Sequence, residues 1–302
     1  MVVETLSQLH AALHRPPPVP VAWPERRRVL MVEPTHFTVA YAINPHMRRS
    51  DGSLNAVNRA KATTQWNAVA DAYRSIGFEV VVMEGQPKLP DMVFAANQSF
   101  PYWSKDGRPS VLLSRMSSPF RQPEVPFFKV WFLENRYEVH ELPGTHLFFE
   151  GCGDAIVQPE RGLLWGGVGP RTTADTYEVL AAYTGLLVVR LPLANEAFYH
   201  LDTCFSLLGQ NTVAVVPEAF SKETLRMIHE AFDTVINVDP DEAMRCLSGN
   251  AHSPDGKHVL FHRGAKFFAR ELERRGFHPV ELDTSEFLKS GGSVFCMKQM
   301  VF

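Results

Sequence analysis

A helix-compatible run followed by a strand-like run recurs five times along this chain, at a spacing of about fifty residues. The strand-like runs combine valine with other apolar residues. They are GFEVVVME (77–84), RYEVHELP (136–143), GLLVVRLP (185–192), FDTVINVDP (232–240) and GFHPVELD (276–283). One such unit cannot bury its own apolar face, so the units must pack against one another. The repeat therefore predicts an α/β protein built as a circular or solenoid array.

The helix-compatible runs place apolar residues at helical spacing. The clearest of them extends from Asn55 to Ile76 and ends at Gly77, because glycine is favoured just after a helix. Further helical runs begin at Thr173, Ser221 and Ala265. Ser221 is a good N-cap residue, since its hydroxyl can accept a bond from a free amide of the first turn.

A strand is also expected before the first helix. Residues 29–44 alternate apolar and polar side chains, with Pro34 as an interruption, and the alternation ends at Asn44-Pro45. Residues 1–28 include Pro16-Pro17-Pro18 and the arginines 26–28, and we expect them to form a flexible, solvated lead-in. This predicts a single catalytic domain over residues 29–302.

Polar residues capable of chemistry follow each strand-like run at a similar distance. They lie in five short apolar segments, PDMVFAAN (90–97), FFEGCGD (148–154), FYHLDTC (198–204), CLSGNAH (246–252) and GGSVFC (291–296). Taken singly, their aspartates and asparagines suit turns or caps, and His200 suits a buried structural histidine. Equivalent segments of a circular array converge on its axis, however. Because the five segments stand at equivalent positions of the repeat, a shared site is favoured. The side chains expected to meet there are Asp91, Asn97, Glu150, Asp154, His200, Asp202 and Cys296.

Cys296 is the candidate nucleophile of this site. A lone cysteine in an apolar run is more often a small buried hydrophobe. Here the preceding Gly291 and Gly292 allow a tight bend and leave room for a ligand beside the thiol. The repeat places a histidine and carboxylates at equivalent positions, so a catalytic role for Cys296 is favoured over a structural one.

Charge and cysteine usage exclude several function classes. The formal net charge is -3, so the chain has no basic footprint for nucleic acid. The four cysteines are far apart and form no CxxC pattern, which indicates a reduced, cytoplasmic protein without a metal site or cofactor. We see no signal-peptide core and no apolar stretch near the roughly 20 residues of a membrane span, and so expect no membrane partner.

Five motifs carry a family resemblance. They are INPHM (43–47), PDMVFAAN (90–97), FEGCGD (149–154), FYHLDTCF (198–205) and GGSVFCM (291–297). In this order they resemble the amidinotransferase superfamily, and most of all its dimethylarginine dimethylaminohydrolases and arginine dihydrolases. The resemblance covers roughly residues 29–302 and implies a five-bladed α/β propeller, or pentein, with pseudo-fivefold symmetry. That architecture agrees with the repeat.

The resemblance implies a mechanism for the converging residues. Cys296 attacks the guanidinium carbon, His200 moves protons, and Glu150 assists His200. Because a guanidinium is a poor electrophile and its amine a poor leaving group, a strong nucleophile and a general acid are both needed. A cationic substrate beside Cys296 would also favour its thiolate. No metal is required, and the partner is a small molecule, arginine or a methylated arginine.

Substrate binding needs acceptors for the guanidinium and a cation for the carboxylate. The candidate acceptors lie in the converging segments or resemble family positions, and they are Asn44, Asp91, Asn97, Asp154 and Asp202, with Phe94 beside them. Arg121 and Arg171 are the candidate carboxylate ligands, because arginine can form a two-pronged clamp.

Asn97 departs from the arginine deiminases and dimethylargininases, which usually have an aspartate there. Its neutral amide leaves two functions open, hydrolysis of N-methylated or free arginine to citrulline, and an arginine dihydrolase that forms ornithine, ammonia and carbon dioxide. A hypothesis of a different class is a non-catalytic arginine sensor. The presence of nucleophile, base and acid favours an enzyme over the sensor. An amine acceptor in place of water, and a homo-oligomeric state, are not decided by the sequence.

Overall fold

The computed structural model describes residues 1–13 and 23–302, and its strands form five separate sheets. In the order in which its strands lie, one sheet has β15 (Gln299–Val301), β2 (Arg28–Val32) and β3 (Glu79–Met83), and the next has β4 (Ser99–Trp103), β5 (Pro109–Leu113) and β6 (Glu138–His140). The third includes β7 (Ala155–Gln158), β8 (Leu163–Val168) and β9 (Leu187–Pro192). The fourth has β10 (Phe205–Gly209), β11 (Thr212–Val215) and β12 (Thr234–Asn237), and the fifth has β13 (His258–His262) and β14 (His278–Leu282). The mixed α/β composition expected from the sequence is confirmed.

One pairing pattern repeats in these sheets. The first strand is antiparallel to the second, and the second is parallel to the third, as in β4, β5 and β6. In the sheet of β13 and β14, an isolated antiparallel bridge between His252 and Leu260 takes the place of the first strand. A parallel pair needs a long crossover, and a helix supplies it in every sheet. This explains why the sequence shows a helix before each strand-like run.

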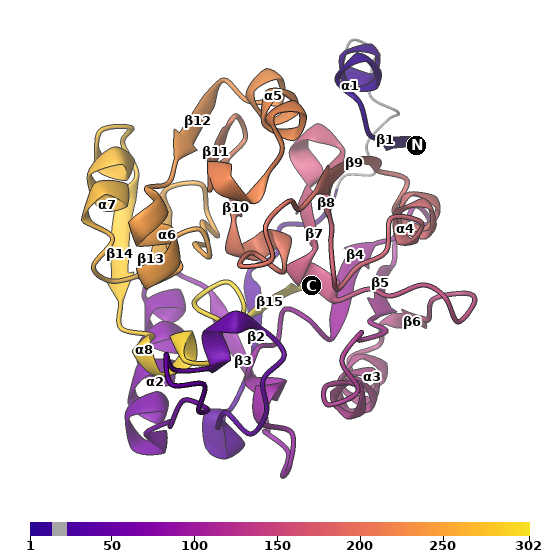
Figure 1. Cartoon of the computed structure of the whole chain (residues 1–302). Coiled ribbons are helices and arrows are strands. Elements are labelled where there is room, and N and C mark those ends of the chain that lie inside the picture. The colour runs from indigo at the N-terminus through magenta and orange to yellow at the C-terminus, as the bar shows by residue number, and fades with distance from the viewer. Residues whose placement is uncertain (14–22) are drawn as a thin grey trace.

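The crossover helices cover the outer side of the molecule, and the strands surround its middle (Figure 1). The helices are α1 (Leu6–Leu13), α2 (Arg59–Ser75), α3 (Val125–Glu134), α4 (Thr176–Thr184), α5 (Lys222–Ala231), α6 (Pro240–Cys246), α7 (Lys266–Glu273) and α8 (Ser285–Leu288). Local signals fix several helix ends. Ser221 caps α5 by accepting a bond from the amide of Thr224, and Gly185 ends α4 in the left-handed conformation. Of the helices described, none is both long and apolar enough to cross a membrane.

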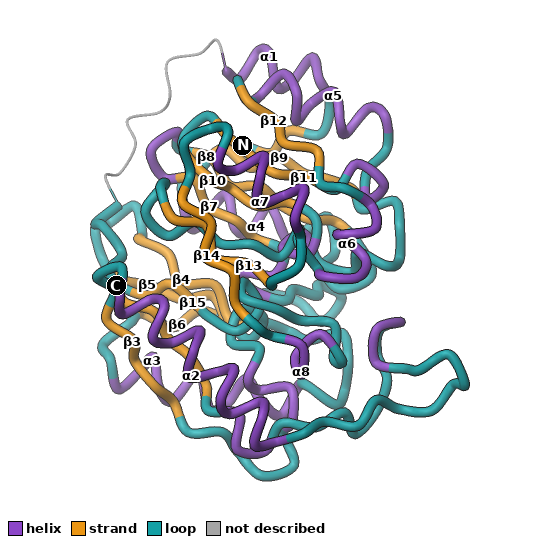
Figure 2. The backbone as a smooth tube through the Cα atoms, turned by 90° about the vertical axis from the view of Figure 1, so that its left-hand side faces the viewer, coloured by secondary structure: helices purple, strands orange, loops and turns teal. Residues whose placement is uncertain are grey.

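Two sequence expectations need correction at the start of the chain. The strand predicted over 29–44 is limited to β2, because Pro34 opens a short 3-10 helix and the rest of the segment is irregular. The lead-in predicted over 1–28 is not a solvated arm in its described part. Val2 and Val3 form β1, which pairs in parallel with β9, and α1 lies beside α5 in the side view (Figure 2).

Burial of apolar side chains explains why the first residues pack against the rest of the molecule. Val3 and Leu9 have almost no exposed surface and belong to the main apolar cluster. The run Pro16-Pro17-Pro18 lies outside the described residues, and the expectation made for it stays a prediction.

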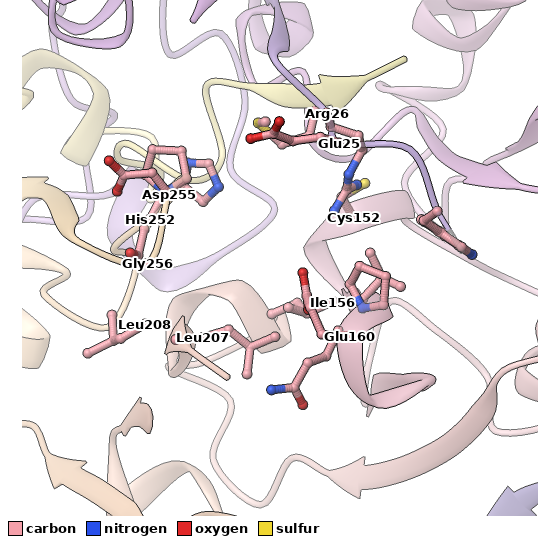
Figure 3. A pocket seen from close by; sticks show the side chains of 18 of the residues that line it. Glu25, Arg26, Cys152, Ile156, Glu160, Leu207, Leu208, His252, Asp255 and Gly256 are labelled. Atoms are coloured by element: carbon pink, nitrogen blue, oxygen red, sulfur yellow. The ribbon is translucent and has the colours of Figure 1, made fainter. Parts of the chain in front are cut away.

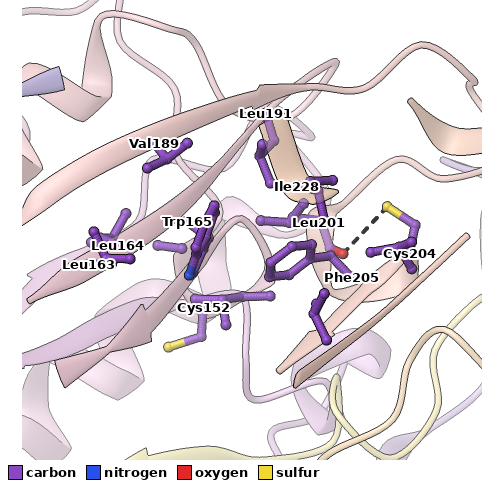
Figure 4. Packing of buried hydrophobic residues seen from close by; sticks show 14 of the residues in the cluster. Cys152, Leu163, Leu164, Trp165, Val189, Leu191, Leu201, Cys204, Phe205 and Ile228 are labelled. Carbon is purple, nitrogen blue, oxygen red and sulfur yellow. Dashed lines mark hydrogen bonds between the residues drawn. The ribbon is translucent and has the colours of Figure 1, made fainter. Parts of the chain in front are cut away.

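The main apolar cluster lies directly behind one of the polar segments. Leu201 and Cys204 are next to His200 and Asp202 in the chain, yet their side chains pack among Trp165 and other core residues (Figure 4). The thiol of Cys204 donates to the carbonyl of Leu201 at 3.5 Å. The dense core therefore holds this segment from behind and leaves its polar side chains facing the middle of the molecule.

The polar segment at residues 149–154 makes an unusually close backbone contact. Gly151 has φ +59°, and a Cβ atom there would lie 2.7 Å from the carbonyl oxygen of Ala96 and nearer still to that of Ser99. Only glycine fits this approach, because an L side chain would be strained and would also collide with a neighbouring backbone.

A matched pair of glycine variants tests this packing. We expect Gly151→Ala to lower the free energy of unfolding by about 3 kcal/mol or more, since left-handed strain and steric overlap add. Gly162→Ala should cost only about 1–2 kcal/mol, because Gly162 has a similar φ of +64° with open space around it. Urea unfolding of both variants measures the difference. Equal losses would show that the contact with Ala96 and Ser99 is not restrictive.

Candidate active site

The five polar segments are joined to one another by hydrogen bonds. Each bond links neighbouring segments, and together they run Ala96 N to Cys296 O (3.1 Å), Cys152 N to Ala96 O (2.7 Å), Leu201 N to Asp154 Oδ1 (3.0 Å), Asn250 Nδ2 to Asp202 O (2.8 Å) and Phe295 N to Asn250 O (3.3 Å). We call this closed series the segment ring. Each segment stands just before the first strand of its sheet, or before the bridge that replaces it. Five positions far apart in the sequence are thereby fixed at one place.

The thiol of Cys296 is held between two polar side chains of this ring. Its Sγ donates to Asp202 Oδ2 at 3.2 Å and accepts from Asn250 Nδ2 at 3.1 Å. The other end of the Asn250 amide accepts from the backbone amides of Ser293, Phe295 and Cys296. Asn250 thus fixes both the thiol and the bend that carries it.

The environment of Cys296 keeps its thiol protonated. Burial raises the pKa of Cys296 well above its usual value, and the negative charge of Asp202 raises it further. Burial also raises the pKa of Asp202. One oxygen of this carboxylate, Oδ1, is buried and has no hydrogen-bond partner among the described residues. A cation placed against Asp202 and Cys296 would reverse this balance and favour the thiolate.

His200 lies across the same space and is held by Glu150. Its Nε2 donates to Glu150 Oε2 at 2.8 Å, and Asp154 is 4.0 Å from the same nitrogen. Burial alone would lower the pKa of His200, but the charges of Asp154, Glu150 and Asp202 raise it above the usual value. The imidazole is therefore poised to carry a proton at neutral pH.

Glu150 is held in its ionised form by several partners. It accepts from the amide and hydroxyl of Ser117 at 3.0 and 2.9 Å, and Arg171 Nη1 lies 3.3 Å from it. Burial opposes ionisation, but the bond and charge of His200 and the charge of Arg171 keep the pKa of Glu150 well below its usual range. Ser117 had no signal in the sequence that pointed to this role.

Arg121 and Arg171, the two residues predicted to bind the substrate carboxylate, have different surroundings. Arg171 donates to the carbonyl of Ile43 at 2.6 Å and lies over the ring of Tyr199. Arg121 is paired with buried Glu124 at 2.9 Å and donates to Asn97 Oδ1, also at 2.9 Å. Most of the donors of Arg121 are therefore already used.

Asn97 is oriented by this contact with Arg121. Because the amide oxygen faces the guanidinium, Nδ2 faces His200 Nδ1 at 3.5 Å. A carboxylate at this position would present an acceptor to the imidazole instead. Arg121 therefore acts on the site through Asn97.

A closed cavity of about 20 Å³ occupies the centre of the site. Its lining brings together most of the predicted residues, namely Asn44, Asp91, Phe94, Asn97, Arg121, Arg171, His200 and Cys296. The volume is sufficient for about one water molecule. Asn44 Nδ2 donates to Ser290 O at 3.0 Å, and the Tyr199 hydroxyl donates to Gly291 O at 2.7 Å. These contacts close the cavity, so an amino-acid ligand requires the loops around Asn44 and Ser290 to separate.

Two predicted ligands are not on the cavity wall. Asp154 is tied behind His200, where it accepts from the Thr172 hydroxyl at 2.7 Å and the Leu201 amide at 3.0 Å. Its position indicates that it supports His200 and does not contact a guanidinium. Asp202 also lies behind the wall, but its partner is the thiol itself. Glu150 likewise reaches the cavity through His200.

Sequence reasoning missed other residues of the site. Asn250 lies in one of the five converging segments, but it is not among the residues that the sequence predicts to meet at the site. Tyr199 adjoins a predicted residue and carried no separate signal. Among the described residues, no group of three or more His, Cys, Asp and Glu side chains is arranged to hold a metal ion.

Comparison with known proteins defines the family of this site. A family model described as N,N dimethylarginine dimethylhydrolase, eukaryotic, matches residues 33–302. The chain is 36% identical over 273 residues to N(G),N(G)-dimethylarginine dimethylaminohydrolase from Mycobacterium tuberculosis, with 90% of this chain and 85% of the relative covered. It is 34% identical over 276 residues to the bifunctional arginine dihydrolase/ornithine cyclodeaminase AgrE from Nostoc sp. and covers 90% of itself but 37% of that relative.

Solved structures agree with these matches. The substrate-bound N-terminal domain of ArgZ, an arginine dihydrolase from cyanobacteria, has a TM-score of 0.83 at 33% identity, with 90% of this chain and 97% of that chain covered. The chain therefore shares the fold of this arginine dihydrolase domain. The chain is a member of the N,N dimethylarginine dimethylhydrolase family.

The link between Glu150 and His200 predicts a measurable titration. We expect the His200 imidazole to titrate above about 6.5, the usual histidine value. Glu150→Gln removes a negative charge that stabilises the imidazolium, so the His200 midpoint should fall by about one pH unit or more. NMR titration of labelled histidines measures both midpoints.

Asp255→Asn is the matched control for this titration. Asp255 bonds the partly exposed His258 at 2.7 Å and is not a partner of His200. Asp255→Asn should therefore leave the His200 midpoint as it is in the parent. A His200 midpoint that is the same in Glu150→Gln as in the parent would contradict the proposed coupling.

Proposed function

We propose that this protein is a hydrolase that attacks the guanidino carbon of arginine or an N-methylated arginine through a covalent bond to Cys296. The observation that carries the proposal is that Cys296 and His200 line one cavity while each has its own carboxylate partner, Asp202 and Glu150. A sensor needs no thiol paired with a proton carrier. The ArgZ domain, a relative by structure, has been solved covalently bound to a reaction intermediate, which supports the same chemistry here.

The first half of the reaction forms a carbon–sulfur bond. The guanidinium enters beside Cys296, and its positive charge lowers the pKa of Cys296 enough to form the thiolate. The thiolate attacks the central carbon, and His200 gives its proton to the departing nitrogen. Ammonia or an alkylamine leaves, and an S-alkyl thiouronium remains on Cys296.

The second half breaks that bond with water. His200, now neutral, takes a proton from a water molecule that attacks the same carbon. The carbon–sulfur bond then breaks, and the ureido product, citrulline, leaves as Cys296 recovers its proton. Glu150 stabilises the imidazolium form of His200 throughout, which lets one residue act first as acid and then as base.

Arg171 is the better of the two candidates for the substrate carboxylate. Its Nη2 bonds the carbonyl of Ile43 on a loop that must move for substrate to enter. Arg121 remains tied to Glu124 and positions Asn97. Asp91, whose Oδ2 is buried without a partner among the described residues, is available for the substrate ammonium.

Asn97 favours a second candidate function, arginine dihydrolase. A neutral amide binds a guanidinium less strongly than a carboxylate does, but it is better matched to the uncharged ureido group. Citrulline would then stay for a second hydrolysis that gives ornithine, ammonia and carbon dioxide. The likeness to AgrE and ArgZ supports this candidate alongside the dimethylargininase one.

The architecture we propose is a five-bladed α/β propeller with pseudo-fivefold symmetry. Each of the five sheets with its crossover helix would be one blade, and the segment ring would lie on the axis. The shared pairing pattern and the outer position of the helices support it (Figure 1). Residues 29–302 would form one catalytic domain, with β1 and α1 as an added edge on the sheet of β9.

Replacement of the nucleophile gives the first test. Cys296→Ser should fold and bind substrate, but its turnover should fall about a thousandfold or more, because a hydroxyl ionises far less than a thiol. Product release from arginine and from N-methylated arginines is the measurement. Cys152→Ser, at another buried thiol, should keep activity within a few-fold of the parent. Equal losses in the two variants, or a fully active Cys296→Ser, would remove Cys296 from the mechanism.

Asn97→Asp tests the choice between the two functions. The new carboxylate pairs with the guanidinium through a charge-assisted bond, roughly twice as strong as a neutral one. Arginine should bind more tightly and citrulline should leave sooner, so the ratio of ornithine to citrulline should fall if the parent is a dihydrolase. Chromatography of the products measures the ratio. An unchanged ratio and unchanged substrate preference would make Asn97 structural.

A further inference from the structure

A second cavity, of about 510 Å³, lies behind the catalytic segments. Its wall includes Cys152 from the segment of Glu150 (Figure 3). Phe295 and Lys298, which stand on either side of Cys296 in the chain, also line it. Its volume is within the range of roughly 300–1,000 Å³ that is common for small-molecule sites. None of its lining residues lines the closed catalytic cavity.

Lys298 stands at the buried end of this cavity. Only 3% of the residue is exposed, and its Nζ lies 3.3 Å from the ring centre of Phe295. The structure gives this ammonium no ion pair and no hydrogen bond within the described residues. A buried cation without an anionic partner is costly, and burial lowers the pKa of Lys298 to about 7. A negatively charged group in the cavity would remove that cost.

The other charges at the cavity decide which ligand suits it. Asp255 is bonded to His258 at 2.7 Å, and Glu25 is paired with Arg27 at 2.7 Å. These two acids therefore already have partners, and both are on the exposed rim.

The remaining lining charges are Arg26, Glu160 and Lys298. Arg26 forms no ion pair among the described residues and lies over the ring of Trp23. Together, Arg26, Glu160 and Lys298 have one net positive charge. The cavity therefore matches a ligand with one negative charge.

Apolar side chains cover much of the wall above Lys298. Ile156, Leu207 and Leu208 surround the cavity on one side, and Arg26 and Cys152 lie on another (Figure 3). These side chains suit a short hydrocarbon tail, and a carboxylate is the anion that a single ammonium with a neighbouring guanidinium can bind.

We propose that this cavity is a second ligand site, which binds a small organic monocarboxylate with its carboxylate on Lys298 and Arg26 and its apolar tail against Ile156, Leu207 and Leu208.

Calorimetric titration with 4-methylpentanoate tests the proposal. We expect saturable binding to the parent protein, and an affinity at least about tenfold weaker in Lys298→Met and in Arg26→Gln, because each loses one cation of the carboxylate site. Lys298→Gln gives a second variant at the buried position if the methionine disturbs folding. Arg263→Gln removes an equal charge at an exposed site outside the cavity, paired with Asp283, and should bind as the parent does.

Two further probes separate the parts of the ligand. The alcohol 4-methylpentan-1-ol has the same tail without the charge and should bind at least about tenfold more weakly than the carboxylate. L-Leucine adds an ammonium, has no net charge and should also bind more weakly. The proposal is overturned if the parent does not bind 4-methylpentanoate, if the Lys298 and Arg26 variants bind it equally well, or if the alcohol or L-leucine binds as tightly.

Discussion

The segment ring is the constraint on which the site depends. Its bonds join backbone and amide groups of segments that belong to five different sheets, so no single sheet contains the site. Asn250 shows how strongly position is fixed, because its one amide holds the carbonyl of Asp202, the thiol of Cys296 and three amides of the terminal bend. Such saturation leaves little freedom for the nucleophile, which is what a reaction that needs fixed distances requires.

Buried charge is balanced in pairs around this ring. Glu150 neutralises His200 and Arg171 from within the core, and Glu124 does the same for Arg121. Removal of one member leaves an uncompensated buried charge, which is far more costly than the loss of an exposed pair. Arg121 and Arg171 therefore have a structural role as well as a chemical one. Asn97 is neutral, and a carboxylate in its place would add a negative charge to these balanced buried pairs.

The sequence predicted the repeat, the helices and the converging segments, because apolar periodicity and caps are local signals. It did not predict hairpins such as that of β4 and β5, although Asp106-Gly107 in their connection is a recognised turn signal. Position in the repeat and the family resemblance predicted that Cys296, His200 and Glu150 come together, which the structure shows, and their catalytic roles stay a prediction. Sequence reasoning wrongly placed Asp154 on the cavity wall. Residues at equivalent positions of the repeat form both the wall and the support behind it, and only the direction of a side chain distinguishes the two. The burial of Val3 and Leu9 depends on a partner sheet about 180 residues away, which no local pattern reveals.

The pairing of β15 with β2 sets the order in which the molecule can become functional. Gln299 lies opposite Leu30, so the sheet that contains β2 is completed by a segment about 270 residues later in the chain. Cys296 precedes β15 directly. Contacts between such distant residues form late, because a long loop must close before they contribute. A nascent chain can therefore fold four of its sheets while it still lacks a nucleophile, and the thiol joins its partners only in the step that closes the circle.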